Sequence, residues 1–362
     1  FPGSMLVRRL VQPRAVQVAR TKGQGLIRTR ASVLSRCPHS PSPQARKLFC
    51  MAGEIRMFST MTSSPPGAGL AHSSNTGTSG FVKHHIKLDG GKQITYEAFE
   101  GSMEKPLIDK REYKLIRLEN GLEALLIHDP EADKASAAMD VRVGHLSDPE
   151  GLYGMAHFCE HLLFMGTKKY PRENEYSEYL SNHSGSSNAF TSLENTNYFF
   201  DVGYAHFEGA LDRFAQFFLE PLFDPSCSER EIRAVDSEHK KNLQSDLWRS
   251  FQLDKSLSNP SHPYSKFGTG NLATLWEKPR EMGLDIRDEL LKFHERYYSA
   301  NMMKLVVLGR ESTAKLTEWV AEKFSNVPNK QCDVPSFPGS PLSDRELGTQ
   351  VLFRTIKDVR LL

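Results

Sequence analysis

The run His157-Phe-Cys-Glu160-His161 places two imidazoles and a carboxylate at a spacing that suits metal chemistry. On a helix of about 3.6 residues per turn, positions i, i+3 and i+4 project from one side, so all three can face one ion. Two neutral histidines leave room on tetrahedral zinc for a third ligand and a water, whose proton the glutamate can take. This order, His-x-x-Glu-His, is the reverse of the more common His-Glu-x-x-His arrangement of zinc-binding helices. The run therefore predicts a hydrolytic zinc site.

An alternative interpretation is an amphipathic helix that buries residues 162–165, with the two histidines merely flanking its apolar face. The preceding sequence favours the metal site. Residues 135–143 are rich in small and β-branched side chains and predict a strand, and residues 144–154 predict the turn into the helix. A helix that follows a core strand is held rigidly, as a catalytic site requires.

A third ligand is expected from a long polar helix that begins near Ser228. Glu231 and Glu238 are seven residues apart on it, so they share one face. Since 238 − 161 = 77 residues separate Glu238 from His161, this ligand would come from a separate helix packed across the first. Charged runs of this kind are more often solvated faces, so the residues alone leave the third ligand open.

The stretch from His157 to Pro171 resembles the pitrilysin-type zinc peptidases, and among them the insulin-degrading and fungal a-factor-processing enzymes. The resemblance covers roughly residues 107–362, in one order. Its further segments are Gly185-Ser-Ser-Asn-Ala-Phe-Thr191, Leu211-Asp-Arg-Phe-Ala-Gln-Phe-Phe218, Ala234-Val-Asp-Ser-Glu-His239 and Lys266-Phe-Gly-Thr-Gly-Asn271.

The resemblance implies roles for the residues of the zinc site. His157, His161 and Glu238 would bind one Zn²⁺ ion per chain, and Glu160 would be the general base. Glu231 matches an acidic residue that orients a ligand histidine, and we group it with Glu160 as catalytic. That role agrees with the usual donation of the second ring N–H of a zinc-bound histidine to a carboxylate or carbonyl.

Peptide substrate is expected at a strand edge. Residues 183–191 run from a glycine-containing turn into a predicted strand that ends near Val202, and an exposed edge can bind an extended peptide as an added strand. Ordinary core packing is the alternative for the aromatic side chains concerned. The resemblance implies that the edge and a neighbouring pocket bind substrate through Asn188, Ala189, Phe190, Phe164 and Trp248.

The first 53 residues differ in composition from the rest. They contain ten basic residues, eight Arg and two Lys, and no Asp or Glu. This composition is typical of a mitochondrial transit peptide, and Arg56-Met57-Phe58-Ser59 resembles a matrix processing site. A disordered tail, or an upstream extension that ends at Met51, is the alternative. We therefore expect the protein in the mitochondrial matrix or the cytosol.

Composition limits the classes of function. The hydrophobic fraction is 39%, and no apolar run approaches the ~20 residues of a membrane span. The chain has 46 basic and 44 acidic residues, so without the first 53 residues it has 46 − 10 = 36 against 44, a net charge of −8. A basic surface for nucleic acid is not supported. The odd number of cysteines, five, favours a reducing compartment over a disulfide framework.

The body of the chain predicts an α+β fold, in which helices pack on an antiparallel sheet. Asn120-Gly121 is a strong hairpin signal. Strands are expected at residues 113–118, 122–128, 135–143, 195–202 and 304–308. Helices are expected at residues 154–165, 174–182, 207–218, 228–256, 286–298 and 312–324.

Four segments are predicted along the chain. They are a transit peptide at residues 1–58, a flexible linker and N-terminal extension at 59–105, a zinc metallopeptidase domain at 106–334, and a linker with the first strands of a truncated second domain at 335–362. The resemblance implies relatives about three times as long as this chain. A C-terminal half or a partner subunit would then be needed to close the catalytic chamber.

The zinc-site residues predict a hydrolytic zinc enzyme, and the resemblance implies a zinc-dependent metalloendopeptidase of insulin-degrading type. It would hydrolyse short or unfolded polypeptides, such as peptide hormones or pheromones. One alternative is a β-type subunit of a mitochondrial processing peptidase. The other is a truncated fragment that binds zinc and peptide without turnover.

Overall fold

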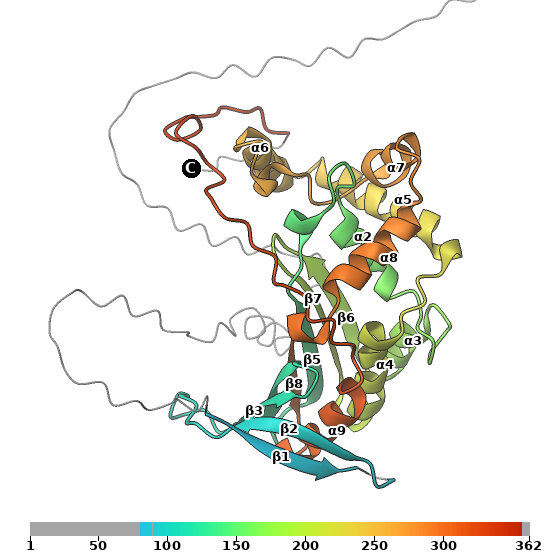
Figure 1. Ribbon diagram of the computed structural model, residues 1–362, viewed down its shortest axis with the longest axis vertical. Helices are drawn as coiled ribbons and strands as arrows, with labels where there is room; N and C mark the ends of the chain where they lie inside the picture. The colour runs from blue at the N-terminus through green and yellow to red at the C-terminus, as the bar shows by residue number, and fades with distance from the viewer. Residues whose placement is uncertain (1–79, 89, 357–362) are drawn as a thin grey trace, which may run out of the picture.

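The structure, a computed structural model, describes residues 80–88 and 90–356. Eight strands of this part of the chain form one sheet in the order β1-β2-β3-β4-β8-β5-β7-β6 (Figure 1). The strands are β1 (Phe81–Lys87), β2 (Gln93–Phe99), β3 (Glu112–Leu118), β4 (Glu123–His128), β5 (Lys134–Val141), β6 (Ser186–Thr191), β7 (Thr196–Gly203) and β8 (Met303–Gly309). The α-helices are α2 (Met155–Leu163), α3 (Glu175–Asn182), α4 (Phe207–Leu219), α5 (Pro225–Asn242), α6 (Asp246–Leu257), α7 (Lys278–Glu281), α8 (Ile286–Tyr297) and α9 (Thr313–Phe324).

The helices α2, α3, α4, α8 and α9 lie to one side of the sheet (Figure 1). Each such helix has an apolar face to bury against the sheet. In helix α4 this face is a stripe of buried residues at helical spacing, namely Phe207, Leu211, Phe214 and Phe218. The main hydrophobic core lies between these helices and the sheet. A smaller apolar cluster lies on the opposite face of the central strands. The predicted α+β class, helices packed on a sheet, is confirmed.

Strand β8 lies between β4 and β5, which are consecutive in the sequence. It pairs parallel with β4 and antiparallel with β5. The sequence-based expectation of antiparallel pairing throughout was therefore wrong at this one pair. A parallel pair needs a long crossover connection, and here the chain between β4 and β8 builds most of the helical layer.

The hairpin predicted at Asn120-Gly121 is present. It joins β3 to β4, and Gly121 adopts a φ of 85° that favours glycine. Two strands were missed, because β1 and β2 form an antiparallel hairpin within the stretch expected to be linker and extension. Their signal is visible in β2, where Ile94, Tyr96 and Ala98 are buried at every second position.

Three expected elements differ in extent from the observed ones. The helix expected at residues 228–256 is two helices, α5 and α6, separated at residues 243–245. The strand expected to continue to Val202 is the hairpin of β6 and β7. The first strands expected within residues 335–362 are not present among the described residues of that segment, and the expected transit peptide lies outside the described residues.

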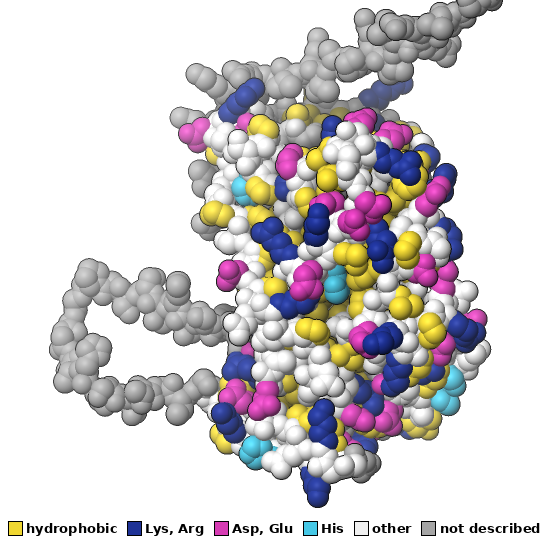
Figure 2. Space-filling model, turned by 45° about the vertical axis from the view of Figure 1, so that its right-hand side comes forward, with side chains coloured by type: hydrophobic (Ala, Val, Ile, Leu, Met, Phe, Trp, Pro, Cys, Tyr) yellow, Lys and Arg dark blue, Asp and Glu magenta, His cyan; other side chains and the backbone are white. Residues whose placement is uncertain are grey.

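The polarity of the helices and the distribution of surface charge can both be described for residues 80–88 and 90–356. No helix in this part of the chain is both long and apolar enough to cross a bilayer. On the face shown in Figure 2, basic and acidic side chains are interspersed rather than gathered by sign.

Candidate metal centre

Helix α2 carries both histidines of the run, and its start is fixed by buried polar contacts. Asp148 accepts hydrogen bonds from the backbone N–H groups of Gly154 at 2.6 Å and Ala156 at 2.8 Å. Gly154 has a φ of 91°, and a Cβ there would lie 2.2 Å from Cα of Gly270. Only glycine allows this backbone turn and this close approach together. The helix is therefore locked against the loop that contains Gly270.

The two imidazoles and the Glu238 carboxylate converge between α2 and α5. Nε2 of His157 lies 3.3 Å from Nε2 of His161 and 3.5 Å from Oε2 of Glu238. Nε2 of His161 lies 3.9 Å from Oε1 of Glu238. One ligand atom from each residue falls within a 4.8 Å span. Glu238, the candidate that the residues alone left open, thus lies beside the two histidines.

The opposite ring nitrogens of both histidines are held from outside. Nδ1 of His157 donates to the carbonyl of Thr269 at 2.7 Å, because a carbonyl can only accept. Nδ1 of His161 lies 3.2 Å from Oε2 of Glu231. With both protons on Nδ1, the two Nε2 lone pairs and the Glu238 carboxylate face one point. Such a set of electron-pair donors suits a cation, and two imidazoles with one carboxylate suit zinc.

The charge around His161 favours a positive partner at this point. Burial alone would lower the pKa of His161, but the hydrogen bond to Glu231 and the charges of Glu160 and Glu238 outweigh it and raise that pKa. The carboxylates around the histidine therefore favour positive charge, whether it is carried by a proton or by a metal ion.

Glu160 lies on the same helix, one residue before His161. It is buried, and Thr191 at the end of β6 donates a hydrogen bond to its Oε2 at 2.5 Å. Burial raises the pKa of Glu160, while His157, His161 and Thr191 act in the opposite direction. This carboxylate can exchange a proton beside the ligand trio.

Cys159, between the predicted site residues, faces the core. It is fully buried, and burial raises the pKa of its thiol to about 12. Its electrostatic partners include Tyr298, a buried residue of the main core. The thiol takes no part in the ligand trio, as the helical spacing predicts.

The expected peptide-binding edge is the edge strand β6. Along it, side chains alternate between the two faces of the sheet. Ala189 packs on the main core and Thr191 contacts Glu160, whereas Phe190 packs on the smaller cluster of the opposite face. The side-chain carbonyl of Asn188 accepts a hydrogen bond from the backbone N–H of Ala189 at 2.9 Å. This edge thus ends beside the metal centre.

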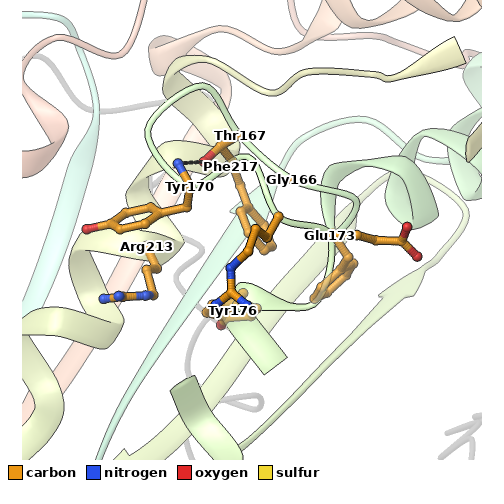
Figure 3. A pocket seen from close by; sticks show the side chains of 9 residues that line it. Gly166, Thr167, Tyr170, Glu173, Tyr176, Arg213 and Phe217 are labelled. Atoms are coloured by element: carbon orange, nitrogen blue, oxygen red, sulfur yellow. Dashed lines mark hydrogen bonds between the residues drawn. The ribbon is translucent and has the colours of Figure 1, made fainter. Parts of the chain in front are cut away.

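The two predicted pocket residues lie in different surroundings. Phe164 contacts three core rings, with a centroid distance of 5.1 Å to Phe217. It also lines a small hollow between the end of α2, α3 and α4, shown in Figure 3. Trp248 is 40% exposed on α6, where its ring centroid lies 6.2 Å from that of Phe251. Their roles in substrate binding stay predictions.

Sequence reasoning missed two residues that hold the candidate site residues in place. Thr269 holds His157 through its backbone carbonyl, and Thr191 donates to Glu160. Both lie in segments that carried the resemblance, at residues 266–271 and 185–191. The sequence therefore indicated Thr269 and Thr191 only through their place in these segments. A threonine by itself does not indicate that it holds a histidine or a glutamate in place.

Two segments of the chain match known families. Residues 123–261 match the family described as Insulinase (Peptidase family M16), and residues 285–361 match the Peptidase M16 inactive domain. The sheet draws strands from both matches, since β4 to β7 lie in the first and β8 in the second. The chain belongs to peptidase family M16, which confirms the resemblance read from the sequence.

Individual relatives agree with this assignment. The insulin-degrading enzyme of Homo sapiens is 59% identical over 252 residues, which cover 70% of this chain and 25% of the relative. The A-factor-processing enzyme of Saccharomyces cerevisiae is 53% identical and covers 74% of this chain and 26% of the relative. The crystal structure of pitrilysin superposes with a TM-score of 0.67 at 39% identity and covers 69% of this chain and 26% of pitrilysin. The chain spans about a quarter of the length of these proteins.

Proposed function

We propose that this chain carries the zinc-binding catalytic domain of a metalloendopeptidase of insulin-degrading type, with one zinc ion per chain. The observation that carries the proposal is the convergence of His157, His161 and Glu238 while both Nδ1 atoms are engaged elsewhere. Two imidazoles and one carboxylate leave a fourth position for water, as in catalytic zinc sites.

When bound, zinc would lower the pKa of a water and polarise the peptide carbonyl. Glu160 would take the proton of the attacking water and return it to the leaving amine. The hydroxyl of Thr191 holds one oxygen of Glu160 and leaves the other for the reaction. Glu231 would keep the proton of His161 on Nδ1, so that Nε2 faces the ion.

The substrate in this proposal is an extended peptide added to the edge of β6. Support comes from the contact between Thr191 and Glu160, which joins the end of this edge to the metal helix. Main-chain hydrogen bonds to residues 188–190 would place the scissile bond and would accept many sequences. Short or unfolded polypeptides therefore suit the site better than folded proteins.

The test is cleavage of a fluorescence-quenched peptide by the purified chain, with and without a chelator, together with measurement of bound zinc. We expect one zinc per chain and turnover that Glu160→Gln abolishes while zinc content stays the same. The surface variant Glu229→Gln is the matched control, since Glu229 is 53% exposed on its side chain and pairs with Arg233. Bound zinc without turnover dependent on Glu160 would leave only a binding function, and no bound zinc would refute the proposal.

The cleavage assay must also allow for the rest of the enzyme. Because the relatives are about four times longer than the matched segment, the substrate chamber is proposed to need a C-terminal half or a partner subunit. Adding the separately produced remainder of a family member should raise turnover without changing the zinc content. Turnover that is already present in the purified chain and does not rise would argue that residues 106–334 act as a self-sufficient peptidase domain.

For the cellular location, we propose mitochondrial matrix or cytosol on the composition of residues 1–53. A mature N-terminus near Ser59 in a matrix fraction would support import. A cytosolic protein that retains Met5 would contradict import.

A further inference from the structure

A second buried polar cluster lies behind the metal helix, outside the groups proposed to act on substrate. Lys255 of α6 is only 1% exposed, and its Nζ lies 2.6 Å from Nε2 of His145. The rings of Phe251 and Tyr264 flank the ammonium, with centroids at 5.5 Å and 5.8 Å. Fully buried lysines are rare unless paired, so the buried pair of Lys255 and His145 indicates a specific structural or functional role.

The direction of this hydrogen bond follows from the charge states. Burial and the charge of Lys255 lower the pKa of His145 to about 3, so its imidazole is neutral near pH 7. Burial lowers the pKa of Lys255 to about 8, against the charge of Asp148, so the ammonium form still predominates at pH 7. Lys255 therefore donates, and Nε2 of His145 accepts.

The His145 ring connects Lys255 to the loop of residues 266–270, which holds the proposed ligand His157. Its ring lies against Gly268 so closely that a Cβ at Gly268 would be 2.5 Å from the ring carbon Cγ. The next residue, Thr269, supplies the carbonyl that accepts from Nδ1 of His157. A shift of the His145 ring would therefore reach Thr269 through van der Waals contact, because interiors are close-packed.

The same loop is fastened from its other end. Nζ of Lys266 donates to the carbonyl of Asp148 at 2.7 Å and to that of Leu146 at 3.3 Å. Residues 266–270 are thus held against residues 145–148 by one lysine of their own and by the ring that Lys255 fixes. The two loops together fix the position of the Thr269 carbonyl relative to α2.

We propose that Lys255 is a positioning residue of the metal centre, which acts on His157 through His145 and the carbonyl of Thr269. The inference rests on the zinc site proposed above. It assigns to α6, which carries none of the three ligands, a part in setting the direction of one ligand imidazole.

Cobalt(II) alone is the probe, since it occupies zinc sites and its visible absorption reports ligand geometry. We expect Lys255→Met to weaken cobalt binding about tenfold, the lower end of the range for groups that orient ligands, and to change the visible spectrum. Lys292→Met is the control, because Lys292 is 70% exposed on its side chain and pairs only across the surface of α8 with Glu289. Its affinity and spectrum should match the unaltered chain.

The double variant Lys255→Met/His145→Leu separates positioning from stability. Replacing both partners of a buried hydrogen bond with apolar groups leaves no unpaired polar atom, so this variant should fold even where the single variant does not. Its cobalt spectrum should still differ from that of the unaltered chain. Unaltered affinity and spectrum in either folded variant would overturn the positioning role alone, whereas an unaltered chain that binds no cobalt would overturn the proposed zinc site as well.

Discussion

At the scale of single residues, the orientation of the proposed ligand imidazoles depends on acceptors outside the His-x-x-Glu-His run. Thr269 and Glu231 each engage an Nδ1 atom, and this leaves both Nε2 atoms facing Glu238. The helical spacing of the run predicts which side chains share a face. It does not predict which ring nitrogen faces the ion, because that depends on partners far away in sequence.

Three glutamates of α5 should differ in their effect on metal affinity. Glu238→Gln removes a proposed charged ligand and should weaken zinc binding by more than about 100-fold, whereas Glu231→Gln should weaken it roughly 10–100-fold. Glu229→Gln, on the exposed face of the same helix, should have no measurable effect. Competition titration with a chromogenic chelator measures all three, and equal affinities for the Glu238 and Glu229 variants would contradict the ligand assignment.

Cys159 should be inert in the folded chain despite its place between the site residues. Its pKa of about 12 and its full burial leave almost no accessible thiolate at pH 8. Among the cysteines of the described residues, iodoacetamide should modify the partly exposed Cys332 before Cys159, which should react only after denaturation. Mass spectrometry of the alkylated peptides measures the order, and early modification of Cys159 would show that α2 opens in the native state.

At the scale of elements, α2 and the 266–270 loop meet through two glycines. Gly154→Ala should lower the free energy of unfolding by more than Gly283→Ala, although both positions have positive φ, at 91° and 70°. The control has open space around its Cα, whereas a Cβ at Gly154 would meet Gly270 at 2.2 Å. We expect an excess of about 1–3 kcal/mol from this overpacking, measured by urea unfolding. Equal losses in the two variants would show that the contact is not rigid.

The sequence predicts elements better than their boundaries and pairings. The Asn120-Gly121 hairpin and the periodic helices α2, α4 and α9 arise from local patterns, and these are present. The break between α5 and α6 and the parallel pairing of β8 depend on tertiary packing, so no local pattern carries them. For the same reason Glu238 was only an open candidate from the residues alone, while the resemblance singled it out.

At the scale of the whole molecule, the buried pair of Lys255 and His145 should affect the pH dependence of stability. The pKa of Lys255 is about 8 in the folded chain, against 10.5 for a lysine that is free of such surroundings, as in the unfolded chain. Between these values the unfolded chain holds the extra proton, so the free energy of unfolding rises with pH by at most about 1.4 kcal/mol per unit. His145 stays neutral in this window, and Asp148, with a pKa of about 7, is largely ionised.

Lys255→Met should remove this increment while leaving other titrations in place. Urea unfolding of both chains at intervals from pH 7.5 to 9.5 gives the difference in slope, in which shared contributions from tyrosines and cysteines cancel. A steeper rise with pH in the unaltered chain is expected. Identical slopes would mean that Lys255 titrates normally and is more hydrated than its 1% exposure indicates.

The insertion of β8 between β4 and β5 has a consequence for the order in which the molecule can assemble. Every proposed ligand precedes residue 239 in the chain, yet the sheet behind them stays in two separate halves until residues 303–309 arrive. One half holds β1 to β4 and the other β5, β7 and β6. During synthesis, the three proposed ligands are therefore made before the sheet is complete. The edges of β4 and β5 stay unpaired until β8, which lies more than 60 residues further along the chain, is available. Pairing of β8 with β4 and β5 would then complete the sheet behind the proposed ligands.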